Sequence, residues 1–254
     1  MSHGPSLTVR EVEFAVVQAM RDEYRREMAC QIVHDSWHRR GFSTLYVLQA
    51  DGASIGYAAV GGSPGEPRDI LKEFYLVPDR RELTLPFARL VIESSQARFI
   101  EAQTNDVQLS LLLWDCATEC ASETVLFADG GSRSLALAEV TLRPITTAER
   151  PNVFAHLLEP VGDWGLEFRG TIVATGGLLT HYNPPFVDLY LEVAEQFRGR
   201  GYGSFLVQEL RRAARAAGHV PAARCHQSNL ASRGALQRGG MSPCARILRG
   251  RVAV

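Results

Sequence analysis

Residues 198–203, Arg-Gly-Arg-Gly-Tyr-Gly, have the composition of a turn that can hold a phosphate group. They follow an apolar run at 186–193 and precede a stretch at 204–217 whose apolar residues recur with helical spacing. Glycine lets the backbone approach an anion, and the first turn of a helix leaves N–H groups that point out of its end. The pattern predicts a strand, a glycine-rich turn and a helix, with a diphosphate bound at the turn.

Three alternative roles for this turn are supported by the sequence to different degrees. A Gly-x-Gly turn alone also fits a plain connection between a strand and a helix. The chain contains no Gly-x-x-x-x-Gly-Lys-Ser/Thr motif, which excludes a P-loop. Gly203 is followed by Ser204, Phe205 and Leu206, so the spacing of a dinucleotide-binding Rossmann turn is absent.

The strand before the turn carries acidic side chains that could act as a general base. Strand periodicity places Asp188, Tyr190 and Glu192 on one face and residues 189, 191 and 193 on the other. The apolar face should pack under a helix, which leaves the polar face for a cleft or for solvent. We expect Glu192 to be the base, acting through water, with Asp188 as the second candidate. A solvated strand face is the alternative for both residues.

Two further polar groups are candidates for binding a substrate. His181, Tyr182 and Asn183 precede two prolines, which stiffen this loop. On the strand expected at 222–226, Arg224 could hold a carboxylate and His226 could act as a base or a donor. A rigid turn and a polar strand edge, respectively, are the alternatives.

Composition restricts the classes of function. The chain has 254 residues, a net charge of −1 and 46% hydrophobic residues, which fits one large domain or two small ones. The balanced charge gives no reason to expect nucleic acid or an anionic membrane as a partner. Five scattered cysteines, with no second pair at zinc-ligand spacing, favour reduced thiols in the cytoplasm and no metal site.

The sequence predicts two related halves, 1–135 and 136–254, with a boundary near the polar turn at 129–133. In the second half we expect a hairpin that turns at Arg169-Gly170. The other elements expected there are strands at 140–143, 186–193, 222–226 and about 245–252, and helices at about 147–157, 204–217 and 230–239.

The first half repeats this order weakly. A hairpin turns at Asp51-Gly52, and residues 73–78 resemble 189–194. The other elements expected there are helices at about 11–29, 31–40 and 84–99, and strands at 107–113 and 124–128. Residues 80–86, at the place of the phosphate turn, contain no glycine. An unrelated N-terminal domain is the alternative to a tandem repeat.

These features together resemble the GNAT family of N-acetyltransferases. Arg198, Gly201 and Gly203 match the family's Arg/Gln-x-x-Gly-x-Gly/Ala turn. Residues 193–198 resemble the end of its fourth strand, and Asn229 to Ser232, followed by Leu236 and Gly240-Met241, resembles its last helix. The resemblance covers about residues 140–254. It implies an α/β fold, the acyl-CoA N-acyltransferase (GNAT) fold, with a mixed, largely antiparallel sheet flanked by helices, here in two tandem copies of which the first is degenerate.

The resemblance also implies the chemistry and the residues that serve it. Acetyl-CoA would be the co-substrate, and the primary amine of a small molecule would attack its thioester directly. The pantetheine arm would pair with the backbone of Leu191 and Val193. The remaining cofactor contacts would come from Arg198, Gly199, Arg200, Gly201, Tyr202, Gly203, Ser204, Asn229 and Ser232.

One position departs from the family pattern. Leu236 stands where the family usually has the tyrosine that protonates the departing thiolate. A module that binds coenzyme A without turnover is therefore the alternative function. A homodimer is left open.

Overall fold

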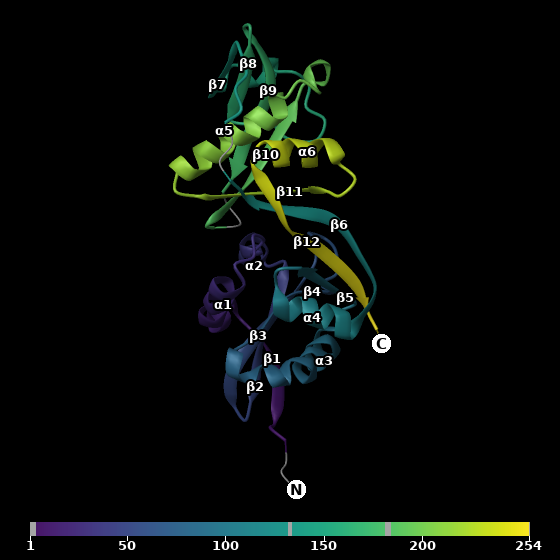
Figure 1. Ribbon diagram of the computed structural model, residues 1–254. Helices are drawn as coiled ribbons and strands as arrows, with labels where there is room; N and C mark the ends of the chain where they lie inside the picture. Colours follow the sequence, from purple (N-terminus) through teal and green to yellow (C-terminus); the bar gives the residue numbers. More distant parts are fainter. Residues whose placement is uncertain (1–3, 132–133, 181–183, 254) are drawn as a thin grey trace. The chain divides into compact units, whose positions relative to one another are not determined.

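The computed structural model describes residues 4–131, 134–180 and 184–253 (Figure 1). The chain forms two compact units. The first unit comprises Met1–Glu123 together with Arg246–Val254, and the second comprises Thr124–Ala245.

The first unit is an α/β layer structure. Its strand order is β1-β2-β3-β4-β5-β12, and only β4 and β5 pair in parallel; β5 pairs antiparallel with the end of β12. Its elements are β1 (Leu7–Val12), α1 (Phe14–Met28), α2 (Asp35–Arg39), β2 (Ser43–Ala50), β3 (Ala53–Gly61), β4 (Ile70–Leu76), the 3-10 helix η1 (Pro78–Leu83), α3 (Thr84–Ser95), β5 (Phe99–Gln103), α4 (Val107–Cys116) and the end of β12 (Met241–Val252).

The second unit has the same kind of sheet with fewer helices. Its strand order is β7-β8-β9-β10-β11-β6, and only β10 and β11 pair in parallel. Its elements are β6 (Ala117–Asp129), β7 (Val140–Pro144), the 3-10 helix η2 (Arg150–Asn152), β8 (Trp164–Phe168), β9 (Thr171–Leu179), β10 (Phe186–Val193), the 3-10 helix η3 (Glu195–Phe197), α5 (Tyr202–Ala216), β11 (Val220–His226) and α6 (Leu230–Arg238).

Both predicted hairpins are confirmed, and the backbone angles of their two-residue turns explain why each turn contains a glycine. Asp51 and Gly52 have φ angles of 50° and 81°, and Arg169 and Gly170 have φ angles of 51° and 77°. Two successive positive φ angles define the type I′ turn, which matches the twist of the flanking strands.

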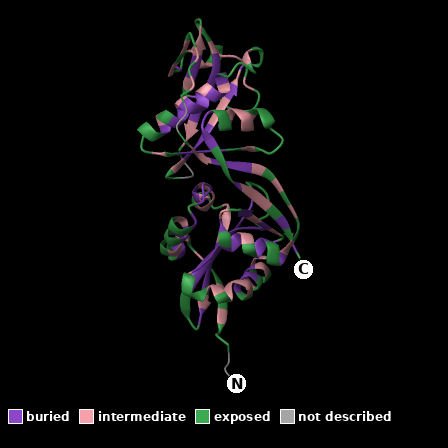
Figure 2. Cartoon of the chain, in the orientation of Figure 1, coloured by how far each residue is buried: buried purple, intermediate pink, exposed green. Residues whose placement is uncertain are grey.

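The core of the second unit lies between its sheet and α5. Leu206, Val207 and Leu210 of α5 are fully buried, and Leu189 of β10 belongs to the same cluster. Buried residues accordingly follow one side of α5 and the central strands in Figure 2. The predicted apolar face of β10 is confirmed, because Leu191 and Val193 pack against this cluster as well.

Three secondary-structure predictions were wrong. Residues 107–113, expected as a strand, lie in the helix α4, which buries Leu109, Leu112, Leu113 and Cys116 at helical spacing. The helix expected at 147–157 is reduced to η2, since Pro151 interrupts the segment. The strand β5 at 99–103 was not predicted, because its polar residues resemble a loop.

The compact units divide the chain differently from the expected domains 1–135 and 136–254. The boundary falls between Glu123 and Thr124, and the last nine residues join the first unit. In the first unit, β5 pairs with Ile247–Arg251 of the C-terminal strand β12. In the second, β11 pairs with Thr124–Ala128 of β6, which follows the first half of the chain. Each sheet is thus completed by a strand from the other half. The boundary between two family copies stays a prediction.

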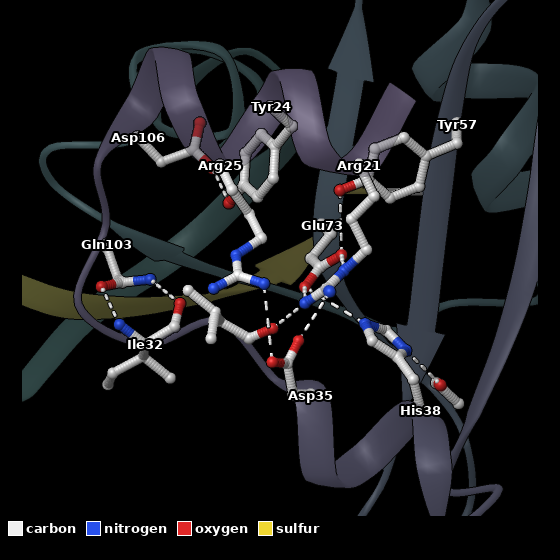
Figure 3. Close-up of polar contacts among 12 residues, drawn as sticks. Arg21, Tyr24, Arg25, Ile32, Asp35, His38, Tyr57, Glu73, Gln103 and Asp106 are labelled. Atoms are coloured by element: carbon white, nitrogen blue, oxygen red, sulfur yellow. Dashed lines mark hydrogen bonds and ion pairs between the residues drawn. The ribbon is translucent and has the colours of Figure 1, made fainter. Parts of the chain in front are cut away.

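A buried ionic network fixes both N-terminal helices on the first unit's sheet (Figure 3). Arg21 of α1 donates to both carboxylate oxygens of Glu73 on β4, at 3.0 and 3.1 Å, and pairs with Asp35 at 2.6 Å. His38 of α2 lies 3.2 Å from Glu73, and the Tyr57 hydroxyl donates to it at 3.0 Å. Burial alone would raise the pKa of Glu73, but Arg21 and His38 outweigh burial and hold it well below its usual value.

Candidate functional site

The central strands of the second unit diverge. β10 and β11 pair at three positions only, from Phe186–Val220 to Asp188–Ala222. Beyond Asp188, β10 continues beside β9 as far as Val193, whereas β11 continues beside β6. The edge of β10 that faces β11 therefore has no strand ladder past Asp188 among the described residues, and an extended ligand could pair with it.

The predicted phosphate turn follows directly from this splayed edge. Gly199 and Gly201 have φ angles of 78° and 88°, a conformation that favours glycine. Gly201 is the N-cap of α5, and the first intrahelical bond runs from Phe205 N–H to Gly201 O at 3.0 Å. The N–H groups of residues 202, 203 and 204 lie before that bond, at the positive end of a 15-residue helix. A glycine N-cap has no side chain to cap them, so these groups suit an anion.

Two arginines add positive charge near the turn. Arg198 donates from Nε to Val193 O at 3.1 Å, and its side chain is half exposed. Arg200 is exposed and lies over the Phe197 ring. Tyr202 is buried, with its ring 6.2 Å from that of Phe197, so its side chain serves the core rather than a ligand. Ser204 is buried and accepts a 3.3 Å hydrogen bond from Arg238.

Glu192 anchors a loop. Its carboxylate accepts hydrogen bonds from three consecutive backbone N–H groups, those of Leu157, Leu158 and Glu159, at 2.9, 3.1 and 3.0 Å. Burial raises the pKa of Glu192, but these three N–H groups and His156 outweigh burial and lower it. A carboxylate held in this way is a weak base, and the contacts favour a positioning role. Catalysis by Glu192 stays a prediction.

The anchored loop presents apolar side chains to solvent. Leu157 and Leu158 are 71% and 84% exposed. The side chain of His156, just before them, is buried, with Nε2 3.2 Å from Thr175 Oγ1 and its ring stacked on Phe154. The loop lies on the polar face of β10, because that is the face that carries Glu192.

Asp188 and Arg224 meet at the base of the splay. Asp188 is buried, and Arg224 Nη2 lies 3.0 Å from its carboxylate. Because Asp188 pairs with Ala222, Arg224 lies two residues further along β11 and on the same face. The structure therefore brings together the second candidate base and one predicted substrate-binding residue.

Most of the remaining predicted site residues lie beside α6 or within it. His226 is exposed and lies 2.7 Å from Ser228 Oγ. Asn229 caps α6 by accepting from Ser232 N–H at 3.0 Å. Leu236 is buried in the core of the second unit, so its side chain does not reach the splay. His181, Tyr182 and Asn183 lie outside the described residues.

The first unit repeats the splay without the turn. β4 and β5 pair only at Ile70–Phe99 and Leu71–Ile100. The chain then enters the 3-10 helix η1, a described segment that contains neither a glycine nor a residue with a positive φ angle. The first unit thus lacks the anion-binding geometry found before α5.

Sequence reasoning missed the loop that Glu192 anchors and the Gln108 amide that binds the end of β4. Pro151 and Pro160 could have signalled an irregular loop at 153–160. Nothing in the sequence signalled its partner, because the contact to Glu192 spans more than 30 residues.

Comparison with known proteins gives the family. Residues 136–241 match the family model described as the acetyltransferase (GNAT) family. This segment includes the splay, the turn and α6, and it belongs to that family. The comparison with curated proteins gives no match.

Solved structures extend the likeness to nearly the whole chain. A GNAT-family acetyltransferase from Colwellia psychrerythraea aligns over 97% of this chain and 100% of its own, with a TM-score of 0.74 and 15% identity. A tandem GNAT protein from the clavulanic acid biosynthesis pathway aligns over 98% and 99%, with a TM-score of 0.60 and 12% identity. At such identities the likeness shows the fold. The chain has the GNAT fold, and the tandem neighbour supports two copies.

Two searches of the described residues bear on other classes of site. None of the described helices is both long and apolar enough to cross a bilayer. Among the same residues, no three His, Cys, Asp or Glu side chains are grouped in a way that could hold a metal ion.

Proposed function

We propose that the second unit binds acetyl-CoA and transfers the acetyl group to the primary amine of a small molecule. The observation that carries the proposal is the splayed edge of β10 leading into a turn with two positive-φ glycines and an uncapped helix N-terminus. The backbone at Leu191 and Val193 would pair with the pantetheine arm. The amides of residues 199–204 would bind the diphosphate.

The reaction is a direct acyl transfer. The nitrogen lone pair of the amine attacks the thioester carbonyl carbon, a C–N bond forms, the C–S bond breaks, and the amine loses a proton. The chain must hold the carbonyl near the acceptor and take up that proton. Asp188 is buried beside Arg224 at the point where the strands begin to diverge, whereas Glu192 lies further along β10 and holds the loop at 157–159. We propose Asp188 as the proton acceptor and Glu192 as a positioning residue.

Residue 236 is a leucine, so no tyrosine at this position can protonate the thiolate. A thiol has a pKa of about 8.5, so the thiolate is a tolerable leaving group without an acid. The leucine at position 236 also supports the alternative function, a unit that binds coenzyme A without turnover.

Release of free thiol separates the two functions. The purified chain is incubated with acetyl-CoA and a panel of primary amines, and the thiol is followed with time. Thiol release that depends on one amine class supports transfer. Saturable binding of coenzyme A with no release on any amine favours the alternative and contradicts the transferase.

A further inference from the structure

The side-chain amide of Gln108 binds the main chain at the end of β4 in the first unit. Its Oε1 accepts from Leu76 N–H at 3.0 Å, and its Nε2 donates to Leu76 O at 3.4 Å. Gln108 is 4% exposed and lies in the first turn of α4. One carboxamide thus satisfies both polar groups of one residue, as the backbone of an added strand would.

In the structure Leu76 corresponds to Val193 of the second unit, one position further along than the match of 73–78 with 189–194 in the sequence. Val77 N–H donates to Ile55 O of the neighbouring strand at 3.0 Å, and Ala194 N–H donates to Val173 O at 2.9 Å. Successive residues of a strand direct their polar groups to opposite edges. Leu76 and Val193 therefore present their N–H and C=O groups to the splay, beyond the last pair of the parallel strands.

The helices that follow can be aligned in the same way. Asp106 caps α4 by accepting from Leu109 N–H at 3.0 Å, and Asn229 caps α6 by accepting from Ser232 N–H at 3.0 Å. Gln108 is the second residue of α4, and Ala231 is the second residue of α6. Alanine has no amide to offer the edge of β10.

Ala231 lies on the same face of α6 as Ala235, which borders the first turn of α5. Ala235, one turn further on, comes within 3.6 Å of a Cβ placed on Gly203, and Val193 comes within 3.5 Å of the same point. Residues four apart share a helix face, so a longer side chain at 231 starts from the face that borders Gly203, whose neighbours also include Val193. In the second unit, Val193 O accepts from the half-exposed Arg198, a surface contact that a ligand can replace.

We propose that the residue at this helical position, together with the glycine turn found before α5, decides which unit accepts the thioester carrier. Gln108 occupies the pairing edge of β4 and closes the first unit, whereas Ala231 leaves the edge of β10 open. The inference rests on the proposed function, because it assumes that the carrier pairs with that edge. It implies one carrier bound per chain, in the second unit.

The direct test introduces a glutamine at position 231 of the second unit, the position equivalent to Gln108. Calorimetry measures coenzyme A binding to the full-length wild type, to Ala231→Gln and to Ala231→Met, which has similar length but no amide. We expect a stoichiometry of one for the wild type and binding about tenfold weaker or more for Ala231→Gln, equivalent to about 1.4 kcal/mol. Ala231→Met should weaken binding less, since it cannot bond to Val193. Thermal melting confirms that both variants fold.

The outcomes distinguish this inference from the proposed function. Unchanged binding by Ala231→Gln, equal weakening by Met and Gln, or two carriers per wild-type chain would each overturn the inference alone. No binding by the folded wild type would overturn the proposed function and, with it, the inference.

Discussion

At the scale of single residues, hydrogen bonds decide what each carboxylate can do. Three backbone N–H groups point at Glu192 and stabilise its charged form, so the residue holds the loop at 157–159 rather than attracting a proton. Asp188 faces Arg224 instead, at the base of the splay. Two carboxylates on one strand face thus have different surroundings and, in our account, different roles.

Replacing Glu192 by Gln separates positioning from catalysis. An amide accepts through one oxygen only, so at least one loop N–H loses its partner, at a cost of about 1–3 kcal/mol. We expect faster hydrogen exchange at residues 157–159 and a raised KM for the amine, with the shape of the pH–rate profile retained. If exchange is unchanged and the acidic limb of the pH–rate profile disappears, Glu192 is the base.

Asp106 gives a pH-dependent prediction. Burial raises its pKa to about 6, although Leu109 N–H and the Tyr24 hydroxyl donate to it. An unfolded Asp has a pKa of about 3.9, so between about pH 4 and pH 6 the folded chain keeps a proton that the unfolded chain has lost. The free energy of unfolding therefore falls as pH rises through this window, by roughly 3 kcal/mol from this residue.

Asp106→Asn should remove that pH dependence. Asparagine caps helices as well as aspartate does, and Asn229 performs this role in α6. Urea unfolding of wild type and variant at several pH values between 4 and 7 measures the difference in slope. If the free energy of unfolding changes with pH in the same way for wild type and variant, the pKa of Asp106 is not raised by folding.

At the scale of secondary-structure elements, the sequence was most informative where local chemistry dictates the backbone. The Asp-Gly and Arg-Gly hairpins and the glycine turn before α5 all require positive φ angles, and all were predicted. The segment 107–113 was predicted as a strand because a short apolar run fits either period. In the structure Asp106 caps a helix there. The loop on Glu192 and the amide on Leu76 depend on distant partners, which no local pattern encodes.

Gln108→Ala tests how strongly α4 holds β4. The variant leaves the buried N–H of Leu76 without its partner, while Leu76 O keeps the bond from Arg81 Nε at 3.5 Å, so we expect a loss of about 1–3 kcal/mol in the free energy of unfolding of the first unit. Denaturant unfolding, with hydrogen exchange at Leu76, measures it. Gln18→Ala, at an exposed position within α1, is the control and should cost less than about 1 kcal/mol. Equal effects would mean that the Leu76 bonds contribute little.

At the scale of the whole molecule, strand exchange makes each unit depend on the other half of the chain. Ile247–Arg251 pairs with β5, and Val252 lies in the core of the first unit. The sequence predicted two copies of one fold but not this exchange, since strand order along the chain does not reveal which sheet the last strand joins.

Truncation after Ala245 should therefore destabilise the first unit, although the deleted residues are at the opposite end of the sequence. The change exposes the edge of β5 and removes the buried Val252, for which we expect a loss of about 2–5 kcal/mol. A chain that ends at Val252 is the control, because it keeps all five pairs. Hydrogen exchange at β5 that is equal in the two chains would contradict the exchange of strands.

The central claim is that the backbone amides of residues 199–204 bind the diphosphate of a thioester carrier. Calorimetry with coenzyme A tests it directly on wild type, Gly201→Ala and Gly218→Ala. Both glycines have positive φ, 88° and 77°, and they lie at opposite ends of α5, so the variants strain the same helix equally. We expect binding to wild type and to Gly218→Ala, and loss of at least tenfold in affinity, about 1.4 kcal/mol, for Gly201→Ala. Absence of binding to the folded wild type, or equal affinity in all three chains, would contradict the account.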